Sequence, residues 1–141
     1  MLDLLSKKPV SKANGITVQL SSLHGRGVFA CEKFSAGAII ETAPVILMEQ
    51  QDKEFLQATS LFSYYFLVGD ATFPVALGLG CASLYNHSYT ANAVYSISLK
   101  DETIQIKACK KIMPGEEITL NYNGTPNDPS PVYFAPEPDA I

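Results

Sequence analysis

Residues 115–122 read GEEITLNY, and the fold of the chain can be approached from this segment. A Pro-Gly pair marks a turn at its start, and Ile118, Leu120 and Tyr122 then alternate with polar residues. An apolar residue at every second position is typical of a half-buried β-strand. We therefore predict that the regular structure ends with a short strand that leads to Tyr122.

Other short segments with the same alternation cover much of the chain. Residues 16–20 predict a half-buried strand, and a glycine-containing turn joins it to a second strand at 28–30. Residues 38–48 favour another strand, but Pro44 predicts an edge or a break there, because proline donates no ladder hydrogen bond. Residues 93–106 predict a β-hairpin.

One segment has a different period. Apolar positions at three- and four-residue steps predict an amphipathic helix over 52–66. The residues at these steps are Phe55, Leu56, Thr59, Phe62, Tyr65 and Phe66. The tail from Asn123 contains five prolines, so no regular structure is expected there. Short strands with one main helix predict a mainly β domain of the α+β class.

Composition limits the class of protein. The chain has 141 residues, which suits one domain, and its 47% hydrophobic and 17% charged residues predict a compact globule. Ten Lys and Arg against 14 Asp and Glu give a formal net charge of -4, which argues against nucleic-acid binding and favours a basic partner. No apolar run is long enough for a membrane span, and the first residues lack a secretion signal, so a soluble protein is expected.

The three cysteines indicate the compartment. Cys31, Cys81 and Cys109 lie far apart without CxxC or CxC spacing. We therefore expect reduced thiols in the core of an intracellular protein, with cytoplasm and nucleus left open. Two dispersed histidines add too few ligands for a structural zinc site, so no metal is expected.

Charge is unevenly distributed along the chain. All ten basic residues lie at or before Lys111, and every charged residue after Lys111 is acidic. These are Glu116, Glu117, Asp128, Glu137 and Asp139. One interpretation is a solvated end of the chain. The other is a docking edge for a substrate rich in lysine and arginine.

Three segments could carry chemistry: GRG at 25–27, NHSYTAN at 86–92 and GEEITLNY at 115–122. Each alone has an ordinary explanation as a tight turn, a loop or a core-edge aromatic. In this order they resemble the SET-domain family of protein-lysine methyltransferases, whose pattern is a GxG turn, an NHSxxPN loop and a GEEIxxxY strand. The resemblance covers roughly residues 15–124.

The resemblance implies a fold of small β-sheets with a knot-like core, in which the last strand threads through a loop and the second and third segments meet. It also implies S-adenosylmethionine as the methyl donor. The cofactor-binding residues implied by the family pattern are His24, Gly25, Arg26, Gly27, Asn86, His87 and Tyr122. Two residues depart from the family pattern. Ala91 replaces the usual proline, and Asn121 stands where many relatives have aspartate.

Methyl transfer to lysine requires a neutral amine. Lysine has a reference pKa of about 10.4, so deprotonation at pH 7 costs roughly 4 to 5 kcal/mol. An apolar channel lowers that pKa, and aromatic rings suit the channel because their faces attract a methylammonium group. No carboxylate base is strictly required. The resemblance implies Tyr122 as the catalytic tyrosine, and we expect its hydroxyl to orient the amine.

The motifs define the other channel residues less closely. Tyr64 and Tyr95 are candidate catalytic and channel residues, with ordinary core positions as the alternative. The resemblance suggests that Tyr95 or Leu120 limits the number of methyl groups, and we expect mono- or dimethylation. Tyr133 and Phe134 are expected to form the outer wall of the channel, since no cysteine-rich zinc segment flanks the domain.

The predicted domain boundaries follow the motifs. We expect residues 1–124 to form the catalytic SET domain and residues 125–141 a proline-rich flank that packs on the substrate channel. The predicted substrate is a basic, lysine-containing protein, which can be a histone, a histone-like protein or another basic protein, with no direct contact to nucleic acid or membrane. Two alternatives stay open. One is a catalytically silent SET-like module that binds cofactor or lysine-bearing peptides, and the other is a scaffold that forms a homodimer through its β edges.

Overall fold

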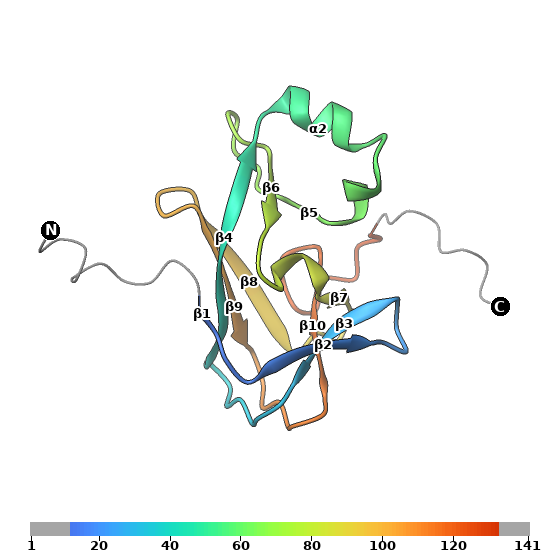
Figure 1. The fold of residues 1–141 in the computed structure, drawn as a ribbon, viewed down its shortest axis with the longest axis vertical. Helices are drawn as coiled ribbons and strands as arrows, with labels where there is room; N and C mark the ends of the chain where they lie inside the picture. Colours follow the sequence, from blue (N-terminus) through green and yellow to red (C-terminus); the bar gives the residue numbers. More distant parts are fainter. Residues whose placement is uncertain (1–11, 133–141) are drawn as a thin grey trace, which may run out of the picture.

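The computed structural model describes residues 12–132, and β-strands dominate its chain path (Figure 1). In chain order the strands are β1 (Lys12–Ala13), β2 (Ile16–Leu20), β3 (Arg26–Ala30), β4 (Ile39–Met48), β5 (Tyr65–Leu67), β6 (Val75–Gly78), β7 (Asn86–His87), β8 (Ala93–Ser98), β9 (Thr103–Ala108) and β10 (Glu117–Leu120). The helices are α2 (Gln50–Leu56) and two 3₁₀ turns, η1 (Ser60–Ser63) and η2 (Ala82–Leu84). The predicted class, mainly β with one main helix, is confirmed.

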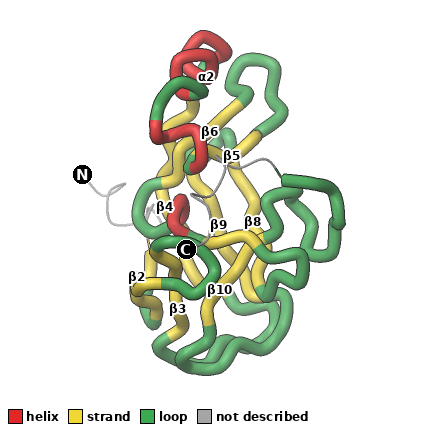
Figure 2. The backbone as a smooth tube through the Cα atoms, turned by 90° about the vertical axis from the view of Figure 1, so that its right-hand side faces the viewer, coloured by secondary structure: helices red, strands yellow, loops and turns green. Residues whose placement is uncertain are grey.

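The last strand, β10, lies between β3 and β8 inside the sheet rather than at its edge (Figure 2). The strand order is β2-β3-β10-β8-β9-β4-β6-β5, and β1 and β7 pair off this path with β4 and β10. β10 is antiparallel to β3 and parallel to β7 and β8. Thr119 pairs with Asn86, and Leu120 pairs with His87. The predicted meeting of the second and third motif segments is therefore confirmed.

β4 is a continuous strand that changes its partner midway. Its first half pairs with β9 and its second half with β6. The sequence predicts an edge or a break at Pro44, and this prediction is wrong, because Pro44 pairs with Thr103 and the strand continues. Pro44 has no backbone N–H to donate, and it lies where β4 changes its partner strand from β9 to β6. At this point the Pro44 carbonyl accepts the N–H of Leu79, and the N–H of Val45 donates to the Glu102 carbonyl.

The predicted helix over 52–66 is wrong in its extent. α2 ends at Leu56, and Thr59 then has an extended backbone and accepts the N–H of Leu61 on its hydroxyl, which starts η1. α2 has no buried residue, and Phe55 is 77% exposed. No helix within residues 12–132 is long and apolar enough to cross a membrane.

β5 accounts for the end of the misassigned helix. Phe66 pairs with Ala76 of β6 and is buried in the core. The helical spacing of the sequence thus spans a helix end, a 3₁₀ turn and a strand. Pairing with β6 determines the conformation at this point, since tertiary contacts override local helix propensity.

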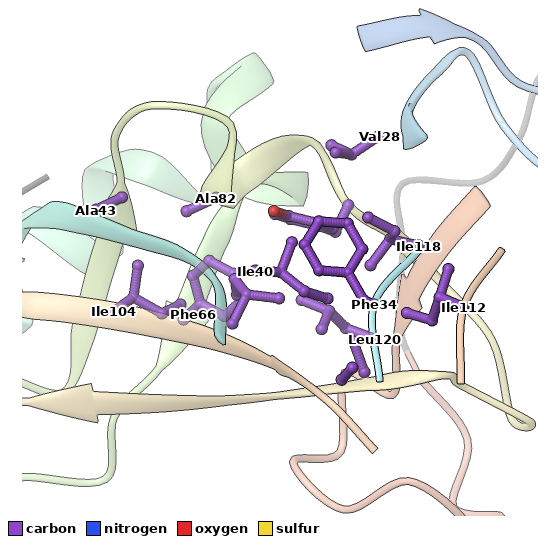
Figure 3. Packing of buried hydrophobic residues seen from close by; sticks show 14 of the residues in the cluster. Val28, Phe34, Ile40, Ala43, Phe66, Ala82, Ile104, Ile112, Ile118 and Leu120 are labelled. Carbon is purple, nitrogen blue, oxygen red and sulfur yellow. The ribbon is translucent and has the colours of Figure 1, made fainter. Parts of the chain in front are cut away.

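The core follows the sheet from the first hairpin to β4 and β6. Figure 3 shows Phe34 beside Ile118 and Leu120, with Ile104 and Phe66 further along the same cluster. Ile118 and Leu120 are fully buried. Their burial fixes the register of β10, because a shift by one residue would turn both side chains out of the core.

The cysteines are less buried than predicted. All three are free thiols, but Cys31 and Cys109 are exposed and only Cys81 is half-buried. The prediction of core thiols is therefore wrong for Cys31 and Cys109. Each follows directly after the end of a strand, β3 or β9, where the chain turns toward solvent.

Candidate active site

Asn86 joins the first and third motif segments. Its amide nitrogen lies 3.0 Å from the carbonyl oxygen of His24, 3.1 Å from that of Arg26 and 2.8 Å from Oε1 of Glu117. β7 brings Asn86 to this position because it pairs in parallel with β10. One buried carboxamide therefore holds the turn at 24–26 against the strand that leads to Tyr122.

Two glycines of this turn have different roles. A Cβ at Gly27 would overlap Oε1 of Glu117 and lie 2.9 Å from Nδ2 of Asn86, so only glycine lets the three segments approach. Gly25 has a φ of +44°, and a Cβ there would meet nothing within 4 Å. The turn thus presents exposed backbone at Gly25 while its base is tightly packed at Gly27.

Glu117 is half-buried, and its carboxylate is bound by other residues of the protein. The hydroxyl of Ser21 lies 2.9 and 2.8 Å from its two carboxylate oxygens, and Asn86 binds it from the other side. The neighbouring Glu116 is exposed, and its carboxylate accepts the N–H of Met113. These contacts engage the Glu117 carboxylate within the protein. The docking-edge interpretation stays a prediction, and Glu137 and Asp139 lie outside the described residues.

Asn92 keeps the second segment attached to β10. Its amide donates to the carbonyl of Glu117 at 2.9 Å, and its Oδ1 accepts the N–H of Thr119 at 2.9 Å. The side chain thereby replaces a neighbouring strand for these two backbone groups. Ala91, in the position of the usual proline, is buried against this region.

Tyr122 follows β10 and is held at both its backbone and its hydroxyl. Its N–H donates to Nδ1 of His87 at 3.1 Å, and its hydroxyl donates to the carbonyl of Tyr85 at 2.5 Å. Burial, and then the neighbouring Tyr64 and Glu117, raise the pKa of the Tyr122 hydroxyl above its ordinary value. The phenol is therefore neutral at physiological pH and presents its oxygen as an acceptor.

His87 supports this arrangement as a neutral imidazole. Because Nδ1 accepts the Tyr122 N–H, the bonding pattern assigns the ring proton to Nε2. Burial lowers the pKa of His87 below its ordinary value, which favours the same neutral form. Its ring also packs edge-on against Tyr122, with centroids 5.2 Å apart.

A cavity of about 340 Å³ opens beside Tyr122. Its lining is largely aromatic, and among the described residues it carries one formal charge, the ammonium group of Lys53. The lining residues are Lys53, Gln57, Phe62, Tyr64, Tyr65, Phe66, Leu67, Ser83, Tyr85, Tyr95, Tyr122, Asn123, Pro131 and Val132. The cavity therefore brings together the three tyrosines that the sequence singles out.

Tyr95 and Tyr64 occupy different depths of this cavity. Tyr95 is half-buried, packs on Phe66 with ring centroids 4.9 Å apart and places its hydroxyl 3.4 Å from the Tyr122 carbonyl. Burial raises the pKa of the Tyr95 hydroxyl. Tyr64 directly follows η1 and is 38% exposed, so it lies toward the cavity mouth.

The remaining channel predictions have a different outcome. Leu120 is 0% exposed, belongs to the hydrophobic core and is not among the lining residues of this cavity, so its assignment to the channel wall stays a prediction. Tyr133 and Phe134 lie outside the described residues. Pro131 and Val132, which directly precede them, line the cavity.

Asn121 shapes the loop that leads to Pro131. Its amide donates to the carbonyls of Pro126 and Asp128 at 3.3 and 2.8 Å, and its Oδ1 accepts the N–H of Asn123. An aspartate could not donate to these carbonyls, which explains the departure from the family pattern at this position.

Two residues of the cavity, Tyr85 and Lys53, are not among the site residues predicted from the sequence. Tyr85 and Lys53 both line the cavity, and the Tyr85 carbonyl binds Tyr122. The only signal for Tyr85 is that it precedes Asn86, whereas Lys53 lies in a segment whose period predicts a longer helix. No cluster within residues 12–132 has the three His, Cys, Asp or Glu residues that a metal site would need.

Known proteins share sequence and fold with this chain. The family model described as SET domain matches residues 25–123. A Schizosaccharomyces pombe protein, described as a histone-lysine N-methyltransferase specific for H3 lysine-37, is 31% identical over 99 residues. The match covers 70% of this chain and 66% of that protein, so the chain spans slightly less than two thirds of its relative.

Solved structures agree with this match. A Plasmodium falciparum protein named as a candidate histone methyltransferase has a TM-score of 0.63 at 28% identity, over 79% of this chain and 95% of that one. A chain of a humanized mutant of the Chaetomium thermophilum Polycomb Repressive Complex 2 has a TM-score of 0.61 at 23% identity, over 82% of this chain and 16% of that one. The second likeness concerns the fold alone.

Proposed function

The chain belongs to the SET-domain family, as its motifs predict, and from this membership we propose that it transfers a methyl group from S-adenosylmethionine to the side-chain amine of a protein lysine. One observation carries the proposal. Tyr122 is fixed by Tyr85 and His87 at the wall of an aromatic cavity, directly beside the joined motif segments. This arrangement suits a reaction in which the protein mainly aligns and desolvates the incoming amine.

The polar groups around Asn86 fit the cofactor. The turn at 24–26 offers exposed backbone and the cationic side chain of Arg26, which suit the amino-acid end of S-adenosylmethionine. The glycine at position 25 leaves open space for a close approach. We propose that this turn, Asn86 and His87 hold the cofactor, which when bound supplies an electrophilic methyl group on a sulfonium.

The aromatic cavity fits the lysine side chain. Among the described lining residues there is no carboxylate, so the site lowers the pKa of the incoming amine through an apolar environment rather than through a carboxylate base. Tyr122 donates its hydroxyl proton to the Tyr85 carbonyl, so its oxygen can accept from the amine and orient it. Tyr64 and Tyr95 flank the stem of the lysine and exclude water.

The substrate class follows from the relatives and the cavity. The Schizosaccharomyces pombe relative is named as acting on a histone lysine, and we propose a histone-like or other lysine-containing protein for this chain. Mono- or dimethylation remains our expectation for the product. The flank after Gly124 contributes Pro131 and Val132 to the cavity, which supports a boundary between a catalytic domain at 1–124 and a channel-covering flank at 125–141.

A methylation assay with one substituted tyrosine tests the proposal. Labelled S-adenosylmethionine is incubated with the protein and a panel of basic proteins, and cofactor binding is followed by calorimetry. Tyr122→Phe is expected to lower turnover at least about 100-fold, because an orienting hydroxyl at the reacting amine is lost. Its affinity for S-adenosylmethionine is expected to stay within about threefold, since the turn and Asn86 are intact.

The matched control is Tyr89→Phe, which removes the hydroxyl of an exposed tyrosine. It is expected to keep wild-type turnover. Wild-type binding of S-adenosylmethionine without any methyl transfer would favour the catalytically silent module instead. Near-wild-type turnover by Tyr122→Phe would contradict the role of Tyr122.

A further inference from the structure

A buried carboxylate lies behind the aromatic cavity, in a position that the motifs do not mark. Glu41 of β4 is 1% exposed. Its Oε1 accepts the hydroxyl of Tyr85 at 2.9 Å, and its Oε2 accepts the N–H of Cys81 at 2.9 Å. Burial raises the pKa of Glu41, and these two hydrogen bonds oppose that shift. A buried carboxylate is retained only where such partners compensate its desolvation.

The two partners of Glu41 are the two ends of one turn. Cys81 is the residue before η2, and Tyr85 is the residue after it. Gly80 has a φ of +60°, and a Cβ there would lie 2.7 Å from Oε2 of Glu41, so the chain passes close against the carboxylate. A single side chain from β4 therefore fixes both the start and the end of the turn at 81–85.

This turn ends at the carbonyl that orients the candidate catalytic hydroxyl. The Tyr85 carbonyl accepts the Tyr122 hydroxyl at 2.5 Å. We propose that Glu41 is a positioning residue: through the side chain of Tyr85 it fixes the Tyr85 carbonyl, and thereby the direction of the Tyr122 hydroxyl at the lysine amine. The proposal rests on the proposed methyl transfer and concerns its rate and the number of methyl groups added.

The chemistry of the contact favours a carboxylate. Both partners of Glu41 donate, and an ionised side chain offers each of them a charged acceptor. In Glu41→Gln the amide oxygen can still accept the N–H of Cys81, and the amide nitrogen then faces the hydroxyl of Tyr85, which must accept instead of donate. The shape of the side chain is kept, and the attachment to Tyr85 is weakened because a charge-assisted hydrogen bond becomes a neutral one.

Tyr85→Phe removes the hydroxyl that donates to Glu41 and so removes the hydrogen bond between these two side chains. The ring stays in the core, the backbone carbonyl stays available to Tyr122, and the bond from Cys81 to Glu41 is kept. In this variant the Glu41 carboxylate keeps its hydrogen bond from the Cys81 N–H, so the variant provides a test even if Glu41→Gln does not fold. Ile104→Val, in the buried part of β9, is the control for a small loss of core packing.

The experiment compares wild type, Glu41→Gln, Tyr85→Phe, their double variant and Ile104→Val well below their melting temperatures. It measures kcat, KM for a lysine peptide, affinity for S-adenosylmethionine and the ratio of mono-, di- and trimethylated product. Tyr85→Phe is expected to lower kcat about tenfold, the equivalent of one hydrogen bond, and Glu41→Gln about threefold, since it weakens this bond without removing it. KM and cofactor affinity are expected to stay within about twofold, and the product ratio to change.

The double variant is expected to be no slower than Tyr85→Phe, because both changes act on the same contact. Ile104→Val is expected to lose stability without a change in kcat or product ratio. Wild-type kcat and product ratio in folded Glu41→Gln and Tyr85→Phe, or fully additive losses, would overturn the positioning role.

An NMR measurement separates this proposal from the proposed function. The chemical shift of the Tyr122 ring Cζ, on isotope-labelled protein, reports the hydrogen bond of its hydroxyl. We expect Glu41→Gln and Tyr85→Phe to change this shift and Ile104→Val to leave it unchanged. A wild type without methyl transfer overturns the proposed function alone, whereas an unchanged shift in both variants overturns the role of Glu41 alone.

Discussion

The two sides of the site are built by different means. The polar side, formed by the turn at 24–26, Gly27, Asn86 and Glu117, is held by short hydrogen bonds and by a glycine that no other residue can replace. On the aromatic side, formed by η1, β5 and Tyr95, the aromatic side chains pack ring against ring, and Tyr95 adds a long hydrogen bond of 3.4 Å to the Tyr122 carbonyl. Tyr122 lies where the two sides meet.

This difference shows where the sequence is constrained. On the polar side the amide nitrogen of Asn86 and the carboxylate of Glu117 have specific hydrogen-bond partners, so the chemical identity of these residues matters. On the aromatic side the cavity needs shape and exclusion of water, which several apolar residues can supply. Substitutions on the polar side are therefore expected to affect cofactor binding strongly, and those on the aromatic side to alter product and substrate preference.

Asn86→Asp is expected to have the largest effect. A carboxylate at this position would face the carbonyls of His24 and Arg26 and the carboxylate of Glu117 without a donor. We expect the free energy of unfolding to fall by about 3 kcal/mol and cofactor affinity to fall about 100-fold. Chemical denaturation and calorimetry measure the two effects.

Glu117→Gln in the same chain is the matching rescue. Its amide can donate to the new carboxylate and restore part of the lost stability. Asn127→Asp, which adds the same charge at an exposed position, is expected to change neither measurement. Wild-type cofactor affinity in Asn86→Asp would remove Asn86 from the binding site.

Gly27→Ala is the next test of the polar side. The added Cβ overlaps Glu117 and presses on Asn86, so we expect a loss of about 2 kcal/mol in unfolding free energy. Gly25→Ala, in the same turn, meets no atom within 4 Å and is expected to cost about 1 kcal/mol through its positive φ alone. Equal losses for the two variants would show that packing at Gly27 is not tight.

Tyr95→Phe tests the aromatic side. Its hydroxyl makes only a long contact of 3.4 Å to the Tyr122 carbonyl, so kcat is expected to change by less than about fivefold. Removal of the hydroxyl leaves more room beside the amine, and we expect mass spectrometry to find a larger share of higher methylation states. Efficient trimethylation by the wild type would contradict this role of Tyr95.

Lys53→Gln is expected to have the smallest effect. The ammonium group of Lys53 is the one formal charge in the described cavity lining, and it repels a substrate with a second basic residue beside the target lysine. Its removal should lower KM about twofold for such a peptide at low salt, and less at high salt. Lys100→Gln, at an exposed turn, is the control, and equal changes in both variants would indicate a general charge effect.

Local patterns in the sequence were sufficient for much of the fold. The alternation at 16–20, 93–106 and 118–122 predicts strands that the structure contains, because a strand with one buried face needs an apolar residue at every second position. The order of the three motifs predicts the family, and the cavity brings Tyr64, Tyr95 and Tyr122 together. The strands follow from residue type and spacing alone, the family follows from the resemblance of the ordered motifs, and the cavity itself is a tertiary feature.

Only the tertiary structure decided which partner each segment takes. The strand at Phe66 and the partners of the Glu117 carboxylate follow from contacts with residues distant in the sequence. The same holds for Glu41, whose carboxylate reaches Tyr85 across 44 positions. Local propensity differs by less than about 1 kcal/mol per residue, whereas burial and pairing of a whole segment contribute several times more, so long-range partners determine such positions.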